Sequence, residues 1–150
     1  MNGIKQELYK KCMNYVSNCI DTAQKAIDDA VESANDDTKS SAGDKYETGR
    51  EMMQQEIDRN RKQLEEAKRQ NLVLEQIEHK EHYDVVQVGS LVITNRGKFY
   101  IGISRGQIHF DGSHYFAISA ISPIGTKLMF QKAGYEFDFN GRTFVIEGIQ

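Results

Sequence analysis

Two carboxylates spaced three residues apart are the strongest candidates in this sequence for direct chemistry. They are Asp44 and Glu47, in the stretch Gly43-Asp44-Lys45-Tyr46-Glu47 between two long charged helical patterns. Mg²⁺ prefers oxygen ligands and is commonly held by one or two carboxylates together with water and phosphate. Residues three apart on a turn or in a first helical turn can face the same way. The pair could therefore supply ligands to a Mg²⁺ ion that another molecule holds weakly.

The same spacing also fits helix capping, which is a purely structural role. Asp44 at the N-cap and Glu47 at the third helical position would form a capping box. Ser41 and Asp44 have the same spacing and offer a competing box. One oxygen of Asp44 cannot fully serve a backbone N–H and a metal ion together. Spacing alone leaves both roles open.

Negative charge is concentrated around this pair, although the whole chain has a net charge of only −3. A net negative charge argues weakly against a nucleic-acid-binding protein. Asp36 and Asp37 would strengthen the negative potential near Asp44 and Glu47. The acidic side chains between residues 28 and 51 are Asp28, Asp29, Glu32, Asp36, Asp37, Asp44, Glu47 and Glu51, against only Lys39, Lys45 and Arg50 as basic ones.

Two helices must position the acidic stretch. Apolar or small residues recur at steps of three and four, which predicts helices over residues 3 to about 34 and 46 to about 79. Each helix has a narrow apolar stripe, so we expect the two to pair antiparallel across a linker at 35–45. The expected stripes are Ile4, Leu8, Cys12, Tyr15, Cys19, Ala23, Ala26 and Ala30, and Met53, Ile57, Leu64, Ala67, Leu74 and Ile77.

The pattern changes from helical to short β-strands near His82. Asn140-Gly141 is a strong signal for a hairpin turn, and Ser122 followed by Pro123 predicts the start of a short helix. We therefore expect an α+β fold: an N-terminal antiparallel two-helix coiled coil over 1–80 with its acidic tip near 36–47, then a small α+β domain over 81–150. The predicted strands are 85–88, 90–94, 98–103, 114–118, 135–139 and 143–149.

The remaining reactive residue types predict no further site. Cys12 and Cys19 lie about 10 Å apart along one helix, which is too far for a disulfide. We expect both as small buried residues of a cytoplasmic protein. The sequence contains no run of about 18 apolar residues, so we expect no membrane span. We expect His79 and His82 at a hinge or on the surface, and His109 and His114, which flank the Asp111-Gly112 turn, on the surface.

Several short motifs occur in a characteristic order along the chain. The most specific is Ser122-Pro123-Ile124-Gly125, which is preceded by Ile121 and followed by Thr126-Lys127-Leu128. With Val88-Gly89-Ser90 before it, Gly134 and Phe144-Val145-Ile146 after it, and Gly43-Asp44-x-x-Glu47 near the tip, the chain resembles the Gre family of bacterial transcript-cleavage factors. The resemblance covers essentially the whole sequence.

This resemblance implies a fold and a function. It implies an FKBP-like fold for 81–150, which would dock at the rim of the secondary channel of RNA polymerase while the coiled coil passes down that channel. Asp44 and Glu47 match the tip carboxylates that help to hold the polymerase's second catalytic Mg²⁺, so that the polymerase cleaves backtracked RNA. The protein would be a cytoplasmic monomer without a cofactor of its own, and would contact the RNA 3′ end only indirectly. Its partner-binding residues would be Ser122, Pro123, Ile124 and Gly125.

One departure from the family pattern keeps a second function open. The family usually follows its tip Glu with Asn-Ala-Glu-Tyr, whereas this chain has Thr48-Gly49-Arg50-Glu51. Relatives with altered tips inhibit polymerase, so the alternative is a protein that binds polymerase and inhibits or modulates transcription without cleavage. A stand-alone enzyme and a coiled-coil adaptor are further hypotheses, although no nucleophile–base set or phosphate loop supports an enzyme.

Overall fold

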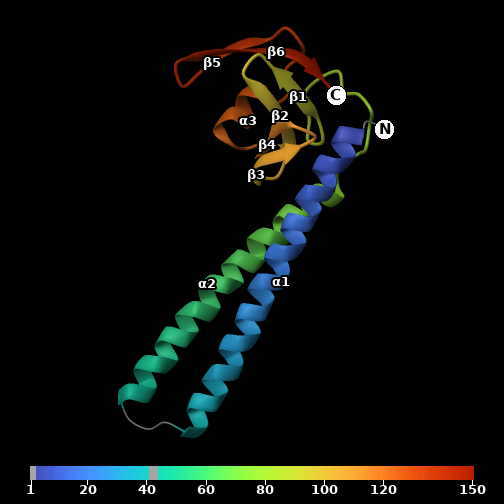
Figure 1. The fold of residues 1–150 in the computed structure, drawn as a ribbon. Coiled ribbons are helices and arrows are strands. Elements are labelled where there is room, and N and C mark those ends of the chain that lie inside the picture. Colours follow the sequence, from blue (N-terminus) through green and yellow to red (C-terminus); the bar gives the residue numbers. More distant parts are fainter. Residues whose placement is uncertain (1–2, 41–43) are drawn as a thin grey trace. The chain divides into compact units, whose positions relative to one another are not determined.

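A computed structural model describes the backbone of residues 3–40 and 44–150 and the side chains of residues 3–35 and 49–150. Two helices, α1 (Gly3–Ser40) and α2 (Asp44–Glu75), run antiparallel and are followed by strands and one short helix (Figure 1). The predicted α+β class with two long N-terminal helices is confirmed. The later elements are β1 (Leu91–Thr94), β2 (Gly97–Gly102), β3 (Gly106–Phe110), β4 (Ser113–Ser119), α3 (Pro123–Leu128), β5 (Glu136–Phe139) and β6 (Arg142–Ile149).

The chain folds as two compact units. The sheet unit contains Met1–Asn14 and Leu72–Gln150, and the arm unit contains Tyr15–Asn71. The first part of α1 and the last turn of α2 thus belong to the sheet unit. The end of α2 and the segment after it pack on β2, since a Cβ added at Gly102 would lie 3.7 Å from Leu74 and 3.8 Å from Ile77. The contacts therefore divide the chain at residues 14–15 and 71–72 and not at residue 80.

The arm unit is held together by a narrow apolar cluster between α1 and α2. The stripe predicted for the second helix is confirmed at Ile57, Leu64 and Ala67, which are buried. The stripe predicted for the first helix is partly wrong, because Tyr15 is 37% exposed. Ala23 and Ala30 of the predicted stripe are buried as expected. The larger side chains of Ile20 and Ile27 pack beside them and remove more apolar area from water, and Val16 is also buried.

The sheet unit has the strand order β3-β4-β2-β1-β6-β5. β2 and β4 are parallel, whereas the other paired strands are antiparallel. The hairpin predicted at Asn140-Gly141 is confirmed, since these residues join β5 to β6 with φ of 53° and 77°. Positive φ at both central residues is the requirement of a type I′ turn. Asp111-Gly112 joins β3 to β4 in the same way, with φ of 51° and 75°.

Two strand predictions were wrong. Residues 85–88 form no strand. Val86 instead donates its N–H to the carbonyl of Gln131 and accepts from the N–H of Phe130, so its backbone pairs with the loop after α3. β3 was missed because it is an edge strand whose burial pattern leaves only Ile108 fully buried. A strand with so little apolar alternation gives a weak sequence signal.

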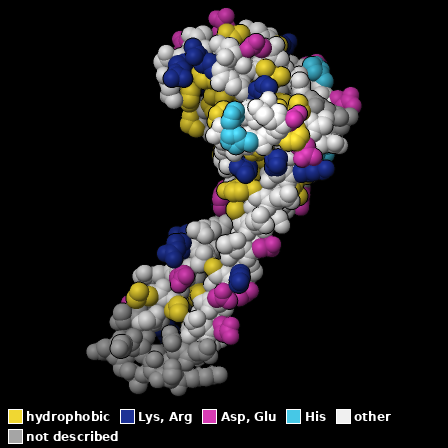
Figure 2. Space-filling view, viewed as in Figure 1, with side chains coloured by type: hydrophobic (Ala, Val, Ile, Leu, Met, Phe, Trp, Pro, Cys, Tyr) yellow, Lys and Arg dark blue, Asp and Glu magenta, His cyan; other side chains and the backbone are white. Residues whose placement is uncertain are grey.

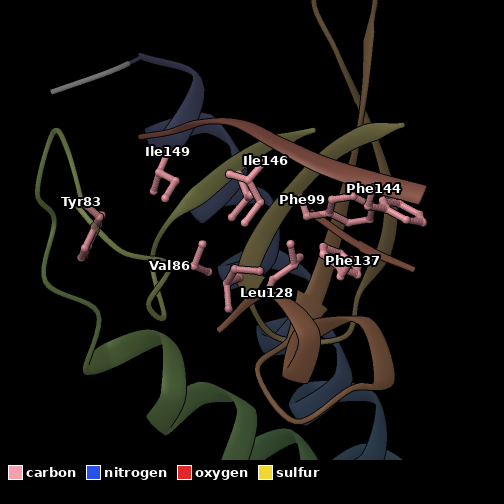
Figure 3. Packing of buried hydrophobic residues seen from close by; sticks show 10 residues of the cluster. Tyr83, Val86, Phe99, Leu128, Phe137, Phe144, Ile146 and Ile149 are labelled. Carbon is pink, nitrogen blue, oxygen red and sulfur yellow. The ribbon is translucent and has the colours of Figure 1, made fainter. Parts of the chain in front are cut away.

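The sheet unit packs its core against α3. Leu128 of α3 is fully buried and lies among the side chains of the sheet (Figure 3). The rings of Phe137 and Phe144 stack with their centroids 5.2 Å apart. The buried members of this cluster are Tyr83, Val86, Val92, Phe99, Ile101, Leu128, Phe137, Phe144, Ile146 and Ile149. This packing fixes α3, which carries the most specific motif of the sequence.

Candidate functional site

The acidic pair lies at the start of α2. That helix begins at Asp44, so the backbones of Asp44 and Glu47 both belong to its first turn. The side chains of 36–48, including both carboxylates and those of Asp36 and Asp37, lie outside the described residues, and so does the backbone of Ser41. The metal role and the capping role of the pair both stay predictions.

The predicted cap of the short helix is confirmed. Ser122 is the N-cap of α3, and Pro123 occupies the first turn. The Ser122 Oγ accepts a hydrogen bond from the Gly125 N–H at 3.1 Å and donates one to the Ser119 carbonyl at 2.7 Å. The hydroxyl is thus occupied inside the protein, where it satisfies one of the free N–H groups of the helix start.

Gly125 is required by close packing rather than by its own backbone freedom. A Cβ at this position would lie 2.1 Å from the carbonyl oxygen of Ser119 and 2.8 Å from the Ser122 Oγ. Ile124 is half-buried and packs against the core. Of the four predicted partner-binding residues, only Pro123 is exposed. The other three therefore build and place α3 more than they present a surface.

The exposed apolar surface flanks α3 on both sides in the sequence. Ile121 is 88% exposed and Phe130 is 72% exposed, so both side chains are largely available for contact. Phe130 has a φ of 66°, which is unusual for a bulky residue. Its N–H donates to the Val86 carbonyl at 2.8 Å, and the Val86 N–H donates to the Gln131 carbonyl at 2.9 Å. These bonds hold the strained backbone and keep the ring in solvent. Apolar side chains at the surface are coloured yellow in Figure 2.

The sequence placed Ile121 in the motif around Ser122 but did not predict its exposure, although a signal for it exists. A hydrophobic residue just before an N-cap usually packs against the fourth helical residue and forms a hydrophobic staple. That position is Thr126 in α3, and its hydroxyl donates to the Pro123 carbonyl. Ile121 thus has no apolar staple partner on α3, which is consistent with its exposure.

The two thiols have different surroundings. Cys12 is buried in the sheet unit, as predicted, and burial raises the pKa of its thiol to about 11, although the positive charge of Arg105 acts in the opposite direction. Cys19 is only half-buried and lines a groove of about 570 Å³ on the arm unit, together with Tyr15, Lys62 and Glu66. Both thiols are free in the structure.

The described residues lack two further features. Within the described parts of α1, α2 and α3, no apolar stretch is long enough to span a bilayer. The described side chains also contain no group of three or more His, Cys, Asp or Glu residues that could hold a metal ion.

No protein-family model matches the chain, and no curated protein matches it either. The likeness to the Gre family therefore rests on the motifs of the sequence alone.

Proposed function

We propose that this protein is a Gre-type elongation factor that binds RNA polymerase and stimulates cleavage of backtracked RNA. The observation that carries the proposal is the pairing of two parts in one chain. One is a two-helix arm in which α2 begins at Asp44, and the other is a sheet unit in which exposed Ile121 and Phe130 flank the capped helix α3. We assign residues 81–150 to the FKBP-like fold of that family, and the protein to the cytoplasm, where polymerase works.

Docking is assigned to the surface around α3. Burying a large apolar side chain contributes about 1.5–3 kcal/mol. Ile121 and Phe130 can both make this contribution because they are exposed before binding. Pro123 is also exposed and completes the contact surface. Ser122, Ile124 and Gly125 support it from within by capping and packing α3.

The tip is assigned a role in metal binding at the polymerase's own active site. Cleavage of RNA by two metal ions needs the ions about 3.5–4 Å apart, and each ion stabilises one of the reacting oxygens. Asp44 and Glu47 would add oxygen ligands to the ion that polymerase holds weakly. The protein would then need no cofactor of its own, and the RNA 3′ end would meet the polymerase's catalytic residues rather than this chain's.

An RNA-cleavage assay on stalled, backtracked complexes with the cognate polymerase tests this function. We expect the unaltered protein to release RNA fragments, and Asp44→Asn with Glu47→Gln to abolish release while binding stays nearly intact. Asn is itself a good N-cap, so a capping role alone would leave Asp44→Asn almost silent. Raising the Mg²⁺ concentration should partly restore the variant.

The matched control is Glu51→Gln, which removes an exposed acid one turn further along α2. It should cleave like the unaltered protein. Full cleavage by the double variant would refute the metal role of Asp44 and Glu47.

Inhibition without cleavage is the second candidate. Arg50 is exposed three residues after Glu47, in a segment that departs from the family pattern. A cation there offsets part of the negative charge that favours Mg²⁺ binding. Slower elongation together with no fragment release by the unaltered protein would support this second function.

A further inference from the structure

The β3–β4 hairpin places two histidines directly opposite each other at the edge of the sheet. His109 and His114 are register partners, and both side chains are exposed. Their ring centroids lie 4.3 Å apart with the planes at 75°. The two-residue turn at Asp111-Gly112 sets the register of the hairpin. The backbone therefore holds the two imidazoles at facing positions of the hairpin. Histidines at the surface are coloured cyan in Figure 2.

This separation is close to what two imidazoles need to share one metal ion. With metal–nitrogen bonds of about 2.0–2.1 Å, two rings on one ion have centroids roughly 4.5 Å apart at a right angle and roughly 5 Å apart at a tetrahedral angle. The observed centroid distance of 4.3 Å is nearer to the right-angle value, which suits a tetragonal ion. The rings lie edge to face in the structure, so a side-chain rotation must turn both ring nitrogens toward a common point before an ion can bind.

Gln107 orients one of the two rings. Its side-chain Nε2 lies 3.0 Å from Nδ1 of His114, so the amide donates to this ring nitrogen in the structure. A 180° turn of the amide brings its oxygen to the same position, where it accepts a proton from Nδ1. That arrangement leaves the Nε2 lone pair of His114 available for a metal. Metal-binding histidines usually donate their second N–H in this way, and the partner fixes both tautomer and ring orientation.

We propose that His109 and His114 form a two-imidazole chelate for a divalent late first-row transition ion, with Cu²⁺ bound most tightly. Imidazole ligands suit Cu²⁺, Ni²⁺ and Zn²⁺, and affinity in this series peaks at Cu²⁺. No third His, Cys, Asp or Glu joins the pair among the residues that the structure describes. The other coordination positions go to water or to a donor from another molecule, so the site is open. It is distinct from the Mg²⁺ chemistry assigned to the tip, because Mg²⁺ prefers oxygen ligands.

Isothermal titration of the untagged full chain with Cu²⁺, and separately with Ni²⁺, tests the chelate. His109→Gln and His114→Gln should each weaken binding at least tenfold, because each removes one of two ligands. Both side chains are exposed, so both variants should keep the fold, as circular dichroism would show. The double variant His79→Gln/His82→Gln is the matched control, since it removes the other two histidines of the chain. It should bind Cu²⁺ as tightly as the unaltered protein, because both imidazole ligands of the chelate are unchanged.

A second measurement locates the ion independently of affinity. At substoichiometric Cu²⁺, paramagnetic broadening should first remove the imidazole proton resonances of His109 and His114. Those of His79 and His82 should persist. The proposal is overturned if the control loses as much affinity as the single variants, or if the His79 and His82 resonances broaden first.

Discussion

The ammonium group of Lys5 lies 4.7 Å from the ring centroid of Tyr83. Its Nζ also donates a hydrogen bond of 2.7 Å to the carbonyl of Lys80, and burial lowers the pKa of Lys5. The Tyr83 hydroxyl donates in turn to the carbonyl of Glu78. The first turn of α1 is therefore tied to the segment after α2 inside the sheet unit. This joint combines a cation–π contact with hydrogen bonds to two backbone carbonyls.

We expect Lys5 and Tyr83 to be energetically coupled. Lys5→Met keeps the aliphatic stem but removes the charge, and Tyr83→Leu removes the ring. A double-mutant cycle by urea denaturation should give a coupling free energy of about 0.5–2 kcal/mol. Tyr83→Phe, which keeps the ring, should retain most of the coupling. Strictly additive losses would show that the contact does not contribute to stability.

The two cysteines should differ sharply in reactivity. The thiolate is the reactive form, and burial disfavours it at Cys12. We expect a disulfide reagent added to the native protein at neutral pH to modify Cys19 and to leave Cys12 unmodified until the protein is denatured. Mass spectrometry of digested peptides would assign the label. Cys19→Ser should then show no fast reaction, and equal labelling of both thiols would contradict the burial of Cys12.

The raised pKa of Cys12 also predicts a pH dependence of stability. An acid whose pKa is higher in the folded state contributes stability that is full below its unfolded pKa of about 8.5. That contribution is lost as the pH rises through the folded value of about 11. Relative to Cys12→Ala, the unaltered protein should lose roughly 2–3 kcal/mol of unfolding free energy between these limits. A pH-independent difference between the two proteins, measured by urea denaturation, would refute it.

Gly125 should tolerate no side chain. Gly125→Ala places a Cβ against the carbonyl of Ser119, so α3 must shift, and we expect a loss of about 1–3 kcal/mol in unfolding free energy. Gly148→Ala in β6 is the matched control, because a Cβ there meets nothing within 4 Å. Thermal unfolding of both variants checks this. Equal melting temperatures would mean that α3 adjusts without cost.

The docking surface should act in binding and not in folding. Ile121→Ser and Phe130→Asn each remove an exposed apolar group, and Asn tolerates the positive φ of Phe130. We expect each variant to weaken polymerase binding at least tenfold while the melting temperature stays within a few degrees, in line with the small effect of most surface changes.

The control for docking is Leu72→Ser, which removes an exposed apolar residue from α2 of the same unit. Its affinity for polymerase should be unchanged. Binding by the Ile121 and Phe130 variants at the affinity of the unaltered protein would move the docking surface elsewhere.

The sequence predicted correctly those elements that depend only on residues next to one another in the chain. The Asn140-Gly141 turn and the Ser122 cap are decided by the residues that form them, and both were predicted correctly. Tertiary contacts decided the rest. Val86 lies in a segment with the residue types of a strand, but its backbone forms hydrogen bonds with Phe130 and Gln131, more than forty positions later. The choice between Tyr15 and Val16 as the buried residue depended on the partner helix, which the pattern of one helix does not contain.

For the candidate site, too, the sequence predicted the local motif but not the features that depend on tertiary contacts. The motif around Ser122 was visible in the sequence, but which of its residues reach solvent was not. Exposure of Ile121 depends on Thr126, and exposure of Phe130 depends on the bonds of Val86. The cross-strand pair of His109 and His114 became visible only once β3 was placed in register with β4.

The division of the chain has a consequence for how this protein can evolve. Residues 15–71 leave and re-enter one folded unit, so the arm is an insertion within the sheet unit and not a domain placed before it. Removing one heptad from α1 and the facing heptad from α2 would shorten such a coiled coil by about 10 Å and keep its apolar register. No residue of the sheet unit would change. Selection can therefore adjust the length of the arm without changing the surface around α3 to which docking is assigned.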